Sequence, residues 1–191
     1  MGHLGLNNLD PDNVEVGVFN FILGTGSFNS RLMREVRSNR GLAYATFGMI
    51  GLGRDKGTFY NFCQTKSQSV GEAIKLMRSI IDDMTKNPVS SEELGVAQKY
   101  EVNAFVHKFD SAQAVVRQAI ILKLEGYPDN YLETYLPRIK QVDAAKVLAI
   151  GKRAVNPSGM VILVVGKKAE VIDQLKGLGP GDIVELPLPK E

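Results

Sequence analysis

The sequence has few of the residues from which disulfide-rich domains and metal sites are built. Its 191 residues include one cysteine, Cys63, and two histidines, His3 and His107. A single cysteine cannot form an intrachain disulfide or supply an all-cysteine zinc site. No run of 18 apolar residues occurs, so we expect no membrane span. No charged and apolar leader follows Met1, so we expect no signal peptide; periplasm and cytoplasm both stay open as compartments.

An excess of charge of one sign is also missing. The 23 Lys and Arg residues nearly balance the 21 Asp and Glu residues, which gives a net charge of +2. A nucleic-acid scaffold or an acidic tail needs a large field of one sign, so both are excluded, and we expect no nucleic-acid partner. The hydrophobic fraction of 44% is that of a globular protein. We expect one domain over residues 1–191, with a loose tail at about 187–191.

Motifs for hydrolysis and nucleotide binding are absent. The zinc peptidase motifs HExxH and HxxEH need two histidines one helical turn apart, and His3 and His107 are far apart in the sequence. Cys63 has no histidine or helix N-terminus nearby to lower its pKa, so we expect it to be buried and inert. The glycine pair at 24–26 falls between two predicted helices, and the pair at 51–53 falls in a predicted hairpin. A nucleotide-binding glycine motif instead lies between a strand and a helix, so both positions disfavour nucleotide binding. We therefore expect no independent hydrolytic site, metal or cofactor in this chain.

The hydrophobic pattern predicts strands at both ends of the chain and helices between them, an α+β fold. Near the N-terminus it predicts an extended segment, two helices and a β-hairpin, at residues 1–6, 14–22, 30–41, 42–52 and 58–65. Gly41 suits the left-handed residue that ends the second helix. Residues 159–166 form an unbroken apolar run, which predicts a strand covered on both faces. A last short strand is predicted at 182–186.

Further helices are predicted at 70–84, 90–108, 110–126, 131–139, 143–155 and 170–176. Ser69 with Glu72, and Ser90 with Glu93, have the spacing of capping boxes at the starts of the first two. The third is predicted to start at Asp110 and to turn four apolar residues toward the core: Val115, Val116, Ala119 and Ile120.

The second helix and the residues after it suggest a function. Four arginines lie on or beside this short helix, and the turn at Gly41 then brings Tyr44 toward the same side: Arg31, Arg34, Arg37 and Arg40. An arginine fork and a phenol can hold a peptide carbonyl, a carboxylate or an oxyanion. Two alternatives remain: a solvated basic helix face with i,i+4 ion pairs, and a less favoured nucleic-acid-binding helix.

The segment from Ser30 to Tyr44, S-R-L-M-R-E-V-R-S-N-R-G-L-A-Y, resembles a signature of one protein family. This signature belongs to the C-terminal, inactive half of the pitrilysin/insulinase zinc metallopeptidases, which include mitochondrial processing peptidase and the core proteins of the cytochrome bc1 complex. Further stretches fit the family in the same order: residues 2–6, 10–24, 62–66, 88–94 and 164–166. The resemblance covers nearly the whole chain.

The resemblance implies a mainly antiparallel sheet packed against a layer of helices. It also implies that zinc is bound by a companion half with an HxxEH motif, on the same polypeptide or a separate subunit. Arg37 and Tyr44 would assist there, the arginine by holding extended peptide substrate and the tyrosine by stabilising the oxyanion. The alternative is a purely structural core or scaffold subunit with no peptidase role. Because the family's domain starts earlier than Met1, its first strand is expected to be incomplete here.

Overall fold

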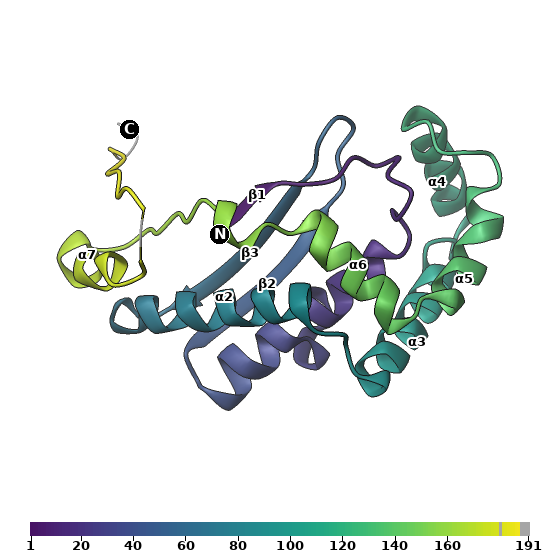
Figure 1. Cartoon of the computed structure of the whole chain (residues 1–191). Helices are drawn as coiled ribbons and strands as arrows, with labels where there is room; N and C mark the ends of the chain where they lie inside the picture. Colours follow the sequence, from purple (N-terminus) through teal and green to yellow (C-terminus); the bar gives the residue numbers. More distant parts are fainter. Residues whose placement is uncertain (180, 188–191) are drawn as a thin grey trace.

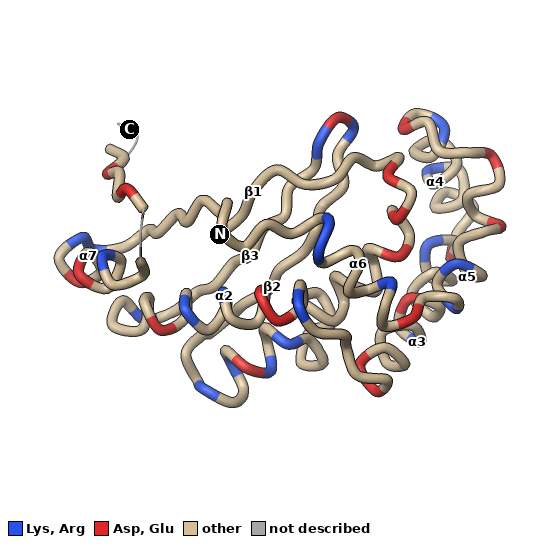
Figure 2. The backbone as a smooth tube through the Cα atoms, in the orientation of Figure 1, with Lys and Arg blue, Asp and Glu red and all other residues tan. Residues whose placement is uncertain are grey.

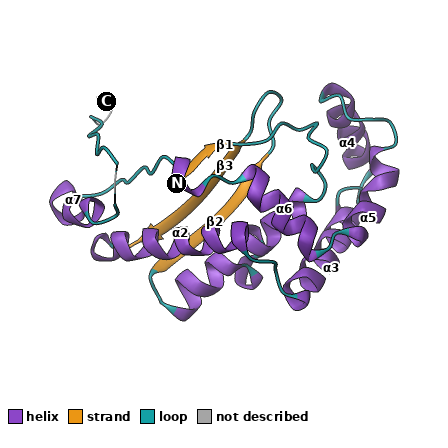
Figure 3. Ribbon diagram, in the orientation of Figure 1, coloured by secondary structure: helices purple, strands orange, loops and turns teal. Residues whose placement is uncertain are grey.

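The fold consists of a small antiparallel sheet with helices packed against one face. The computed structural model describes residues 1–179 and 181–187, so the predicted loose tail lies almost wholly outside the described residues. Figure 1 shows the strands at the centre of the molecule, with α7 (Lys168–Lys176) beyond one end of the sheet and α3 (Ser91–His107), α4 (Ala112–Leu124) and α5 (Tyr131–Gln141) beyond the other. Figure 3 shows that helices make up a much larger part of the chain than strands. The predicted α+β class is confirmed.

Three strands form the sheet in the order β1-β3-β2, with antiparallel neighbours: β1 (Gly2–Leu4), β2 (Ala43–Gly51) and β3 (Thr58–Thr65). Ile50 and Phe59 pair across β2 and β3 and are buried under the helices. Phe47 and Phe62 pair on the opposite face, where Phe62 is 45% exposed. The predicted hairpin is therefore confirmed, and it leaves one face of the sheet open.

The first helical segment lies directly on the hairpin. α1 (Val16–Asn20) continues into the π-helical turn η1 (Phe21–Thr25), which matches the helix predicted over 14–22. Gly24 is in such close contact with Gly48 of β2 that a Cβ at Gly24 would overlap the Gly48 backbone. The absence of a side chain therefore allows η1 to approach the sheet closely.

The remaining helices are η2 (Ser27–Asn29), η3 (Met33–Asn39), η4 (Ser67–Ser69), α2 (Val70–Lys86), α3 (Ser91–His107), α4 (Ala112–Leu124), α5 (Tyr131–Gln141), α6 (Ala144–Ala154), η5 (Pro157–Gly159) and α7 (Lys168–Lys176). The capping box of Ser90 and Glu93 is confirmed at the start of α3. The one predicted for Ser69 and Glu72 is wrong. Ser69 ends a 3-10 turn with φ −107° and ψ 5°, rather than taking the extended conformation of a capping residue, and its side chain makes no cap bond.

The prediction for α4 is wrong in its cap and its orientation. Ser111, not Asp110, caps the helix by accepting a hydrogen bond from the Ala114 amide. The four apolar residues predicted to face the core are exposed: Val115, Val116, Ala119 and Ile120. α4 lies at the periphery (Figure 1), and its less exposed side is formed by the shorter series Ala114, Gln118 and Leu122. Helical periodicity identifies an apolar stripe but not what covers it, and nothing in the described chain covers this one.

The C-terminal segment also differs from its prediction. Residues 159–166 form no strand; they make a single bridge, between Val161 and Gly2, and Leu163 and Val165 are exposed. β1 begins at Gly2, so beyond this bridge the described chain places no strand residue beside Ile162–Gly166. The strand predicted at 182–186 is also wrong, since these residues form no regular structure. No helix formed by residues 1–179 and 181–187 has both the length and the hydrophobicity that crossing a bilayer needs.

Candidate functional site

The helix η3 (Met33–Asn39) carries the predicted site arginine and ends where the sequence predicts. Gly41 has φ +62°, a left-handed conformation that glycine adopts without strain. Its amide donates to the Arg37 carbonyl at 3.0 Å, and the Leu42 amide donates to the Val36 carbonyl at 2.9 Å. These bonds close the helix and turn the chain directly into β2.

Tyr44 occupies an irregular position at the start of β2. Ala43 pairs with Thr65 and Ala45 pairs with Gln64, so Tyr44 is an extra residue in this strand, a β-bulge. Bulges of this kind change the direction of a side chain. Tyr44 is 77% exposed as a result, on the side of the sheet where η3 ends.

The structure brings Arg37 and Tyr44 together, as predicted. The guanidinium carbon of Arg37 lies 5.8 Å from the centre of the Tyr44 ring and 5.2 Å from that of Phe28. Its Nη1 also contacts the sulfur of Met33 at 3.9 Å. Within the part of the chain that the structure describes, Arg37 forms no ion pair with a carboxylate. Two aromatic rings therefore flank the guanidinium, and its N–H groups other than the one on Met33 remain available to an acceptor from outside.

Phe28 is a member of this site that sequence reasoning missed. It follows Ser27, a non-glycine residue with φ +50°, and it is 60% exposed. The Ser30 hydroxyl donates to the Ser27 carbonyl at 2.7 Å and closes this tight turn. Strained turns and exposed aromatic rings both occur often at functional sites. The signal available in the sequence was an aromatic residue in a glycine- and serine-rich turn, but nothing in its spacing links it to Arg37.

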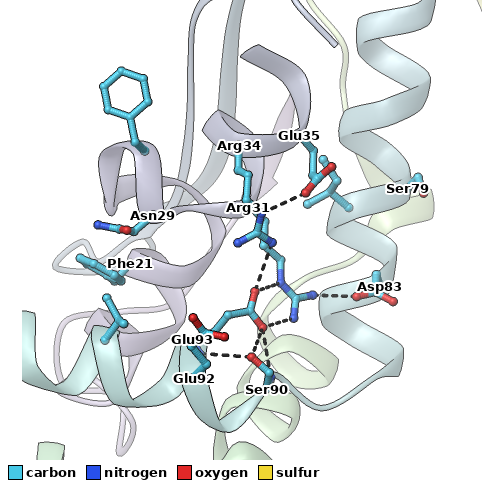
Figure 4. A pocket seen from close by; sticks show the side chains of 13 residues that line it. Phe21, Asn29, Arg31, Arg34, Glu35, Ser79, Asp83, Ser90, Glu92 and Glu93 are labelled. Atoms are coloured by element: carbon cyan, nitrogen blue, oxygen red, sulfur yellow. Dashed lines mark hydrogen bonds and ion pairs between the residues drawn. The ribbon is translucent and has the colours of Figure 1, made fainter. Parts of the chain in front are cut away.

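Arg31 has a structural role, in an ion-pair cluster (Figure 4). It donates to the two carboxylate oxygens of Glu93 at 2.7 and 2.8 Å, and to Asp83 at 2.6 Å. The Arg31 guanidinium, together with the bonds from Ser90, lowers the pKa of Glu93 to about 2, against the opposing effect of burial. Arg31 therefore connects the segment before η3 to α2 and α3, and it is not part of a solvated basic face.

Arg34 is also paired with carboxylates, at 3.0 Å from Glu35 and 3.6 Å from Glu93. It borders a hollow of about 640 Å³, which is lined by Phe21, Phe28, Asn29, Arg31, Arg34, Glu35, Ser79, Ile80, Asp83, Ser90, Glu92, Glu93 and Val96. Four carboxylates and two arginines face this space, so it does not attract anions. Figure 2 shows basic and acidic residues mixed along the chain in the same way. Of the four arginines, Arg31 and Arg34 are thus unsuited to bind phosphates.

The histidines and the cysteine lie apart from this site. The His3 ring donates through Nδ1 to the Leu4 carbonyl at 2.8 Å and accepts a hydrogen bond from the Asn156 amide at Nε2, 3.0 Å away. His107 is exposed at the end of α3. Cys63 is half-buried, and burial raises the pKa of its thiol, as expected for an unreactive cysteine. The described residues include no cluster of three potential metal ligands.

Comparison with known proteins identifies the family. The sequence profile described as "peptidase M16 inactive domain" matches residues 4–100, which is half of the chain and includes Phe28, Arg37 and Tyr44. The chain belongs to this family. The resemblance to the inactive half of zinc peptidases, seen first in the segment from Ser30 to Tyr44, is thereby confirmed.

Relatives and solved structures of M16 proteins agree with this assignment. An uncharacterized zinc protease of Streptomyces coelicolor is 32% identical over 97 residues, which cover 51% of this chain and 21% of the relative. A protein of Helicobacter pylori named non-peptidase homolog YmxG is 22% identical over 85% of this chain and 38% of its own. The crystal structure of a peptidase M16 inactive domain from Pseudomonas fluorescens superposes with a TM-score of 0.76 at 28% identity, over 82% of this chain and 37% of that one. This chain thus spans less than two fifths of the length of each.

Proposed function

We propose that this M16 inactive domain is the non-catalytic half of a two-half zinc metallopeptidase, in which it helps to enclose an extended peptide substrate. The companion half, on the same polypeptide or on a separate subunit, would carry the HxxEH motif and the zinc. The observation that supports this role is the placement of Arg37, an arginine with no carboxylate partner among the described residues, between the exposed rings of Phe28 and Tyr44. The hypothesis assigns each of these groups a task at the peptide bond.

Arg37 would hold the substrate. A guanidinium presents several N–H donors in a plane, which suits a peptide carbonyl or a terminal carboxylate. The neighbouring aromatic rings restrict its movement without occupying its donors. Binding an acceptor would therefore cost this side chain little conformational entropy.

Tyr44 would donate its phenol hydrogen to the oxygen that becomes negative when the peptide bond is attacked. A donor placed in advance for such an oxyanion lowers the barrier by about 3 kcal/mol in favourable cases. The zinc of the companion half would supply Lewis-acid activation of water or of the carbonyl. This chain does not itself offer a zinc site in its described residues, since they include no suitable group of three ligands.

The test is peptide cleavage by the reconstituted pair of halves. Arg37→Ala and Tyr44→Phe should each lower kcat/KM by about 100-fold, because each removes the donor group that the hypothesis assigns to that residue. Arg40→Ala is the matched control, since Arg40 is exposed near the end of the same helix. It should stay within about twofold of the wild type. Full kcat/KM in both site variants would contradict the catalytic role.

A second candidate is a purely structural subunit without a peptidase role. It is favoured by one observation, that the H. pylori relative is named a non-peptidase homolog. The two candidates differ in the partner that they require. A partner without an HxxEH motif, in a complex that assembles but cleaves no peptide, would support the structural role.

A further inference from the structure

The chain between η3 and β2 is held by bonds to a single residue, Leu42. Its amide donates to the Val36 carbonyl of η3 at 2.9 Å, and its carbonyl accepts a hydrogen bond from the Thr65 hydroxyl of β3 at 2.5 Å. Arg37 follows Val36 directly in η3. Tyr44 comes two residues after Leu42. Leu42 therefore connects the helix that carries the arginine to the strand that lies beside the tyrosine.

The register of the hairpin shows which residue Thr65 would face in a regular ladder. Residues 45–51 of β2 pair without interruption with residues 58–64 of β3, the long neighbouring strands in Figure 1. Continued by one more residue, this register would place Tyr44 opposite Thr65. The bulge places Ala43 there instead and leaves Tyr44 outside the pairing.

The two registers would send the Tyr44 side chain to different faces of the sheet. Side chains alternate along a strand, and Phe47 lies on the open face, so Ala45 lies there too. A tyrosine next to Ala45 in a regular ladder would point to the face that the helices cover. In the bulged register the small, buried Ala43 takes that position, and Tyr44 is exposed beside the Arg37 guanidinium.

The Thr65 hydroxyl favours the bulged register. It reaches the carbonyl of Leu42, the residue directly before the one that Thr65 faces. If Tyr44 moved opposite Thr65, Leu42 would lie one residue, about 3.3 Å, further along the strand and out of the hydroxyl's reach. The half-buried Leu42 would then have a carbonyl without its donor, which is unfavourable.

We propose that Thr65 is a positioning residue: its hydroxyl, by holding the Leu42 carbonyl, fixes the bulge at Tyr44 and so keeps the phenol beside Arg37. The placement of Tyr44 concerns this chain alone and can be measured without a peptidase. Its consequence for cleavage rests on the proposed function, in which the phenol stabilises the oxyanion. Thr65 touches no substrate in this role and acts only through the tyrosine.

The Arg37 side chain reports this placement in NMR spectra of the whole chain. The rings of Phe28 and Tyr44 lie 5.2 and 5.8 Å from the guanidinium carbon, so their ring currents shift the Arg37 Nε–H resonance. Tyr44→Leu defines the part of the shift that the tyrosine contributes. Thr65→Val keeps the shape of the side chain without the hydroxyl and should remove most of that part. Thr65→Ser restores a hydroxyl and should recover it.

Thr46→Val is the matched control. Thr46 is also a strand threonine, and its hydroxyl donates to the Phe62 carbonyl at 3.0 Å, but it lies in the regular part of the hairpin. This variant should leave the Arg37 resonance unchanged. Thr65→Ala removes the hydroxyl without placing a methyl group against the Leu42 carbonyl, so it repeats the test in case the valine variant does not fold. It should change the resonance in the same way.

Cleavage by the reconstituted halves separates positioning from a general loss of stability. Thr65→Val should lower kcat by about tenfold with little change in KM, because an oxyanion donor acts in the transition state and not in substrate binding. In a Tyr44→Phe background the same substitution should have no further effect, since the Thr65 hydroxyl acts through the phenol. A full further loss in that background would contradict the positioning role.

The NMR outcomes decide the placement independently of activity. An unchanged Arg37 resonance in both Thr65→Val and Thr65→Ala would mean that packing around Ala43 alone sets the bulge, and it would overturn the proposal. An equal change in Thr46→Val would show a general effect of the hairpin hydroxyls and would also overturn it. If the resonance changes as expected while Thr65→Val and Tyr44→Phe both keep full kcat, the placement stands and the proposed function of Tyr44 fails.

Discussion

The ion pair between Arg31 and Glu93 should make the stability of this domain fall at acid pH by an amount that one substitution can isolate. Arg31 lowers the pKa of Glu93 from an ordinary value of 4.5 to about 2. A carboxylate with a lowered pKa contributes its stability above the unfolded pKa and loses it as the pH falls toward the folded pKa. For these two values, the loss between pH 7 and pH 3 is about 2 kcal/mol. The Glu93 side chain is only 15% exposed, so solvent screens little of this.

Urea unfolding of the wild type and of Glu93→Gln at pH 7 and pH 3 measures this contribution. The variant should be less stable than the wild type at pH 7, and the difference should shrink by about 2 kcal/mol at pH 3, where wild-type Glu93 is almost wholly protonated in the unfolded state but still mostly ionised in the folded state. Glu92→Gln is the matched control: the residue is exposed and adjacent, so its effect should be small at both values. An effect of Glu93→Gln that is equal at pH 7 and pH 3 would refute the reasoning.

Two further substitutions test the packing and the aromatic contacts. Gly24→Ala should destabilise the domain by about 3 kcal/mol or more in urea unfolding, because the methyl group of the new alanine would overlap the backbone of Gly48. Gly95→Ala is the control: a Cβ there would meet no atom within 4 Å, so this change should instead stabilise α3 by about 1 kcal/mol. Phe28→Leu should lower kcat/KM of the reconstituted peptidase by about 2–5-fold, the value of one cation–π contact, with unfolding unchanged. Phe28→Tyr keeps an aromatic ring and should keep kcat/KM at the wild-type value. A loss of kcat/KM as large as that of Phe28→Leu would show that the ring's contact with Arg37 does not contribute to the rate.

Features set by neighbours in sequence were predictable. The capping box of Ser90 and Glu93 needs only residues three apart, and the left-handed turn at Gly41 depends on the backbone of one residue. The pairing of Arg37 with Tyr44 was accessible through the family signature, since seven residues and one turn separate them. These signals are local, so the rest of the chain does not alter them.

Features that depend on distant partners were not predictable. The apolar run at 159–166 has the composition of a buried strand, but the one pairing that it makes in the described chain is with β1, at the other end of the sequence. The apolar stripe on α4 has the periodicity of a core-facing helix, but periodicity does not distinguish a covered face from an exposed one. Phe28 reaches Arg37 only through the strained turn at Ser27, a conformation that residue type does not favour.

The distribution of carboxylates distinguishes Arg37 from Arg31 and Arg34 on the same helical segment. Arg31 and Arg34 lie where α2 and α3 supply Asp83 and Glu93, so their charges are neutralised within the domain. Arg37 forms no ion pair with a described residue of either helix and lies beside the rings of Phe28 and Tyr44. A partly buried guanidinium without a carboxylate still lacks strong acceptors for its N–H groups. An acceptor brought by a bound chain would meet that need, and its binding would gain free energy that the isolated domain lacks.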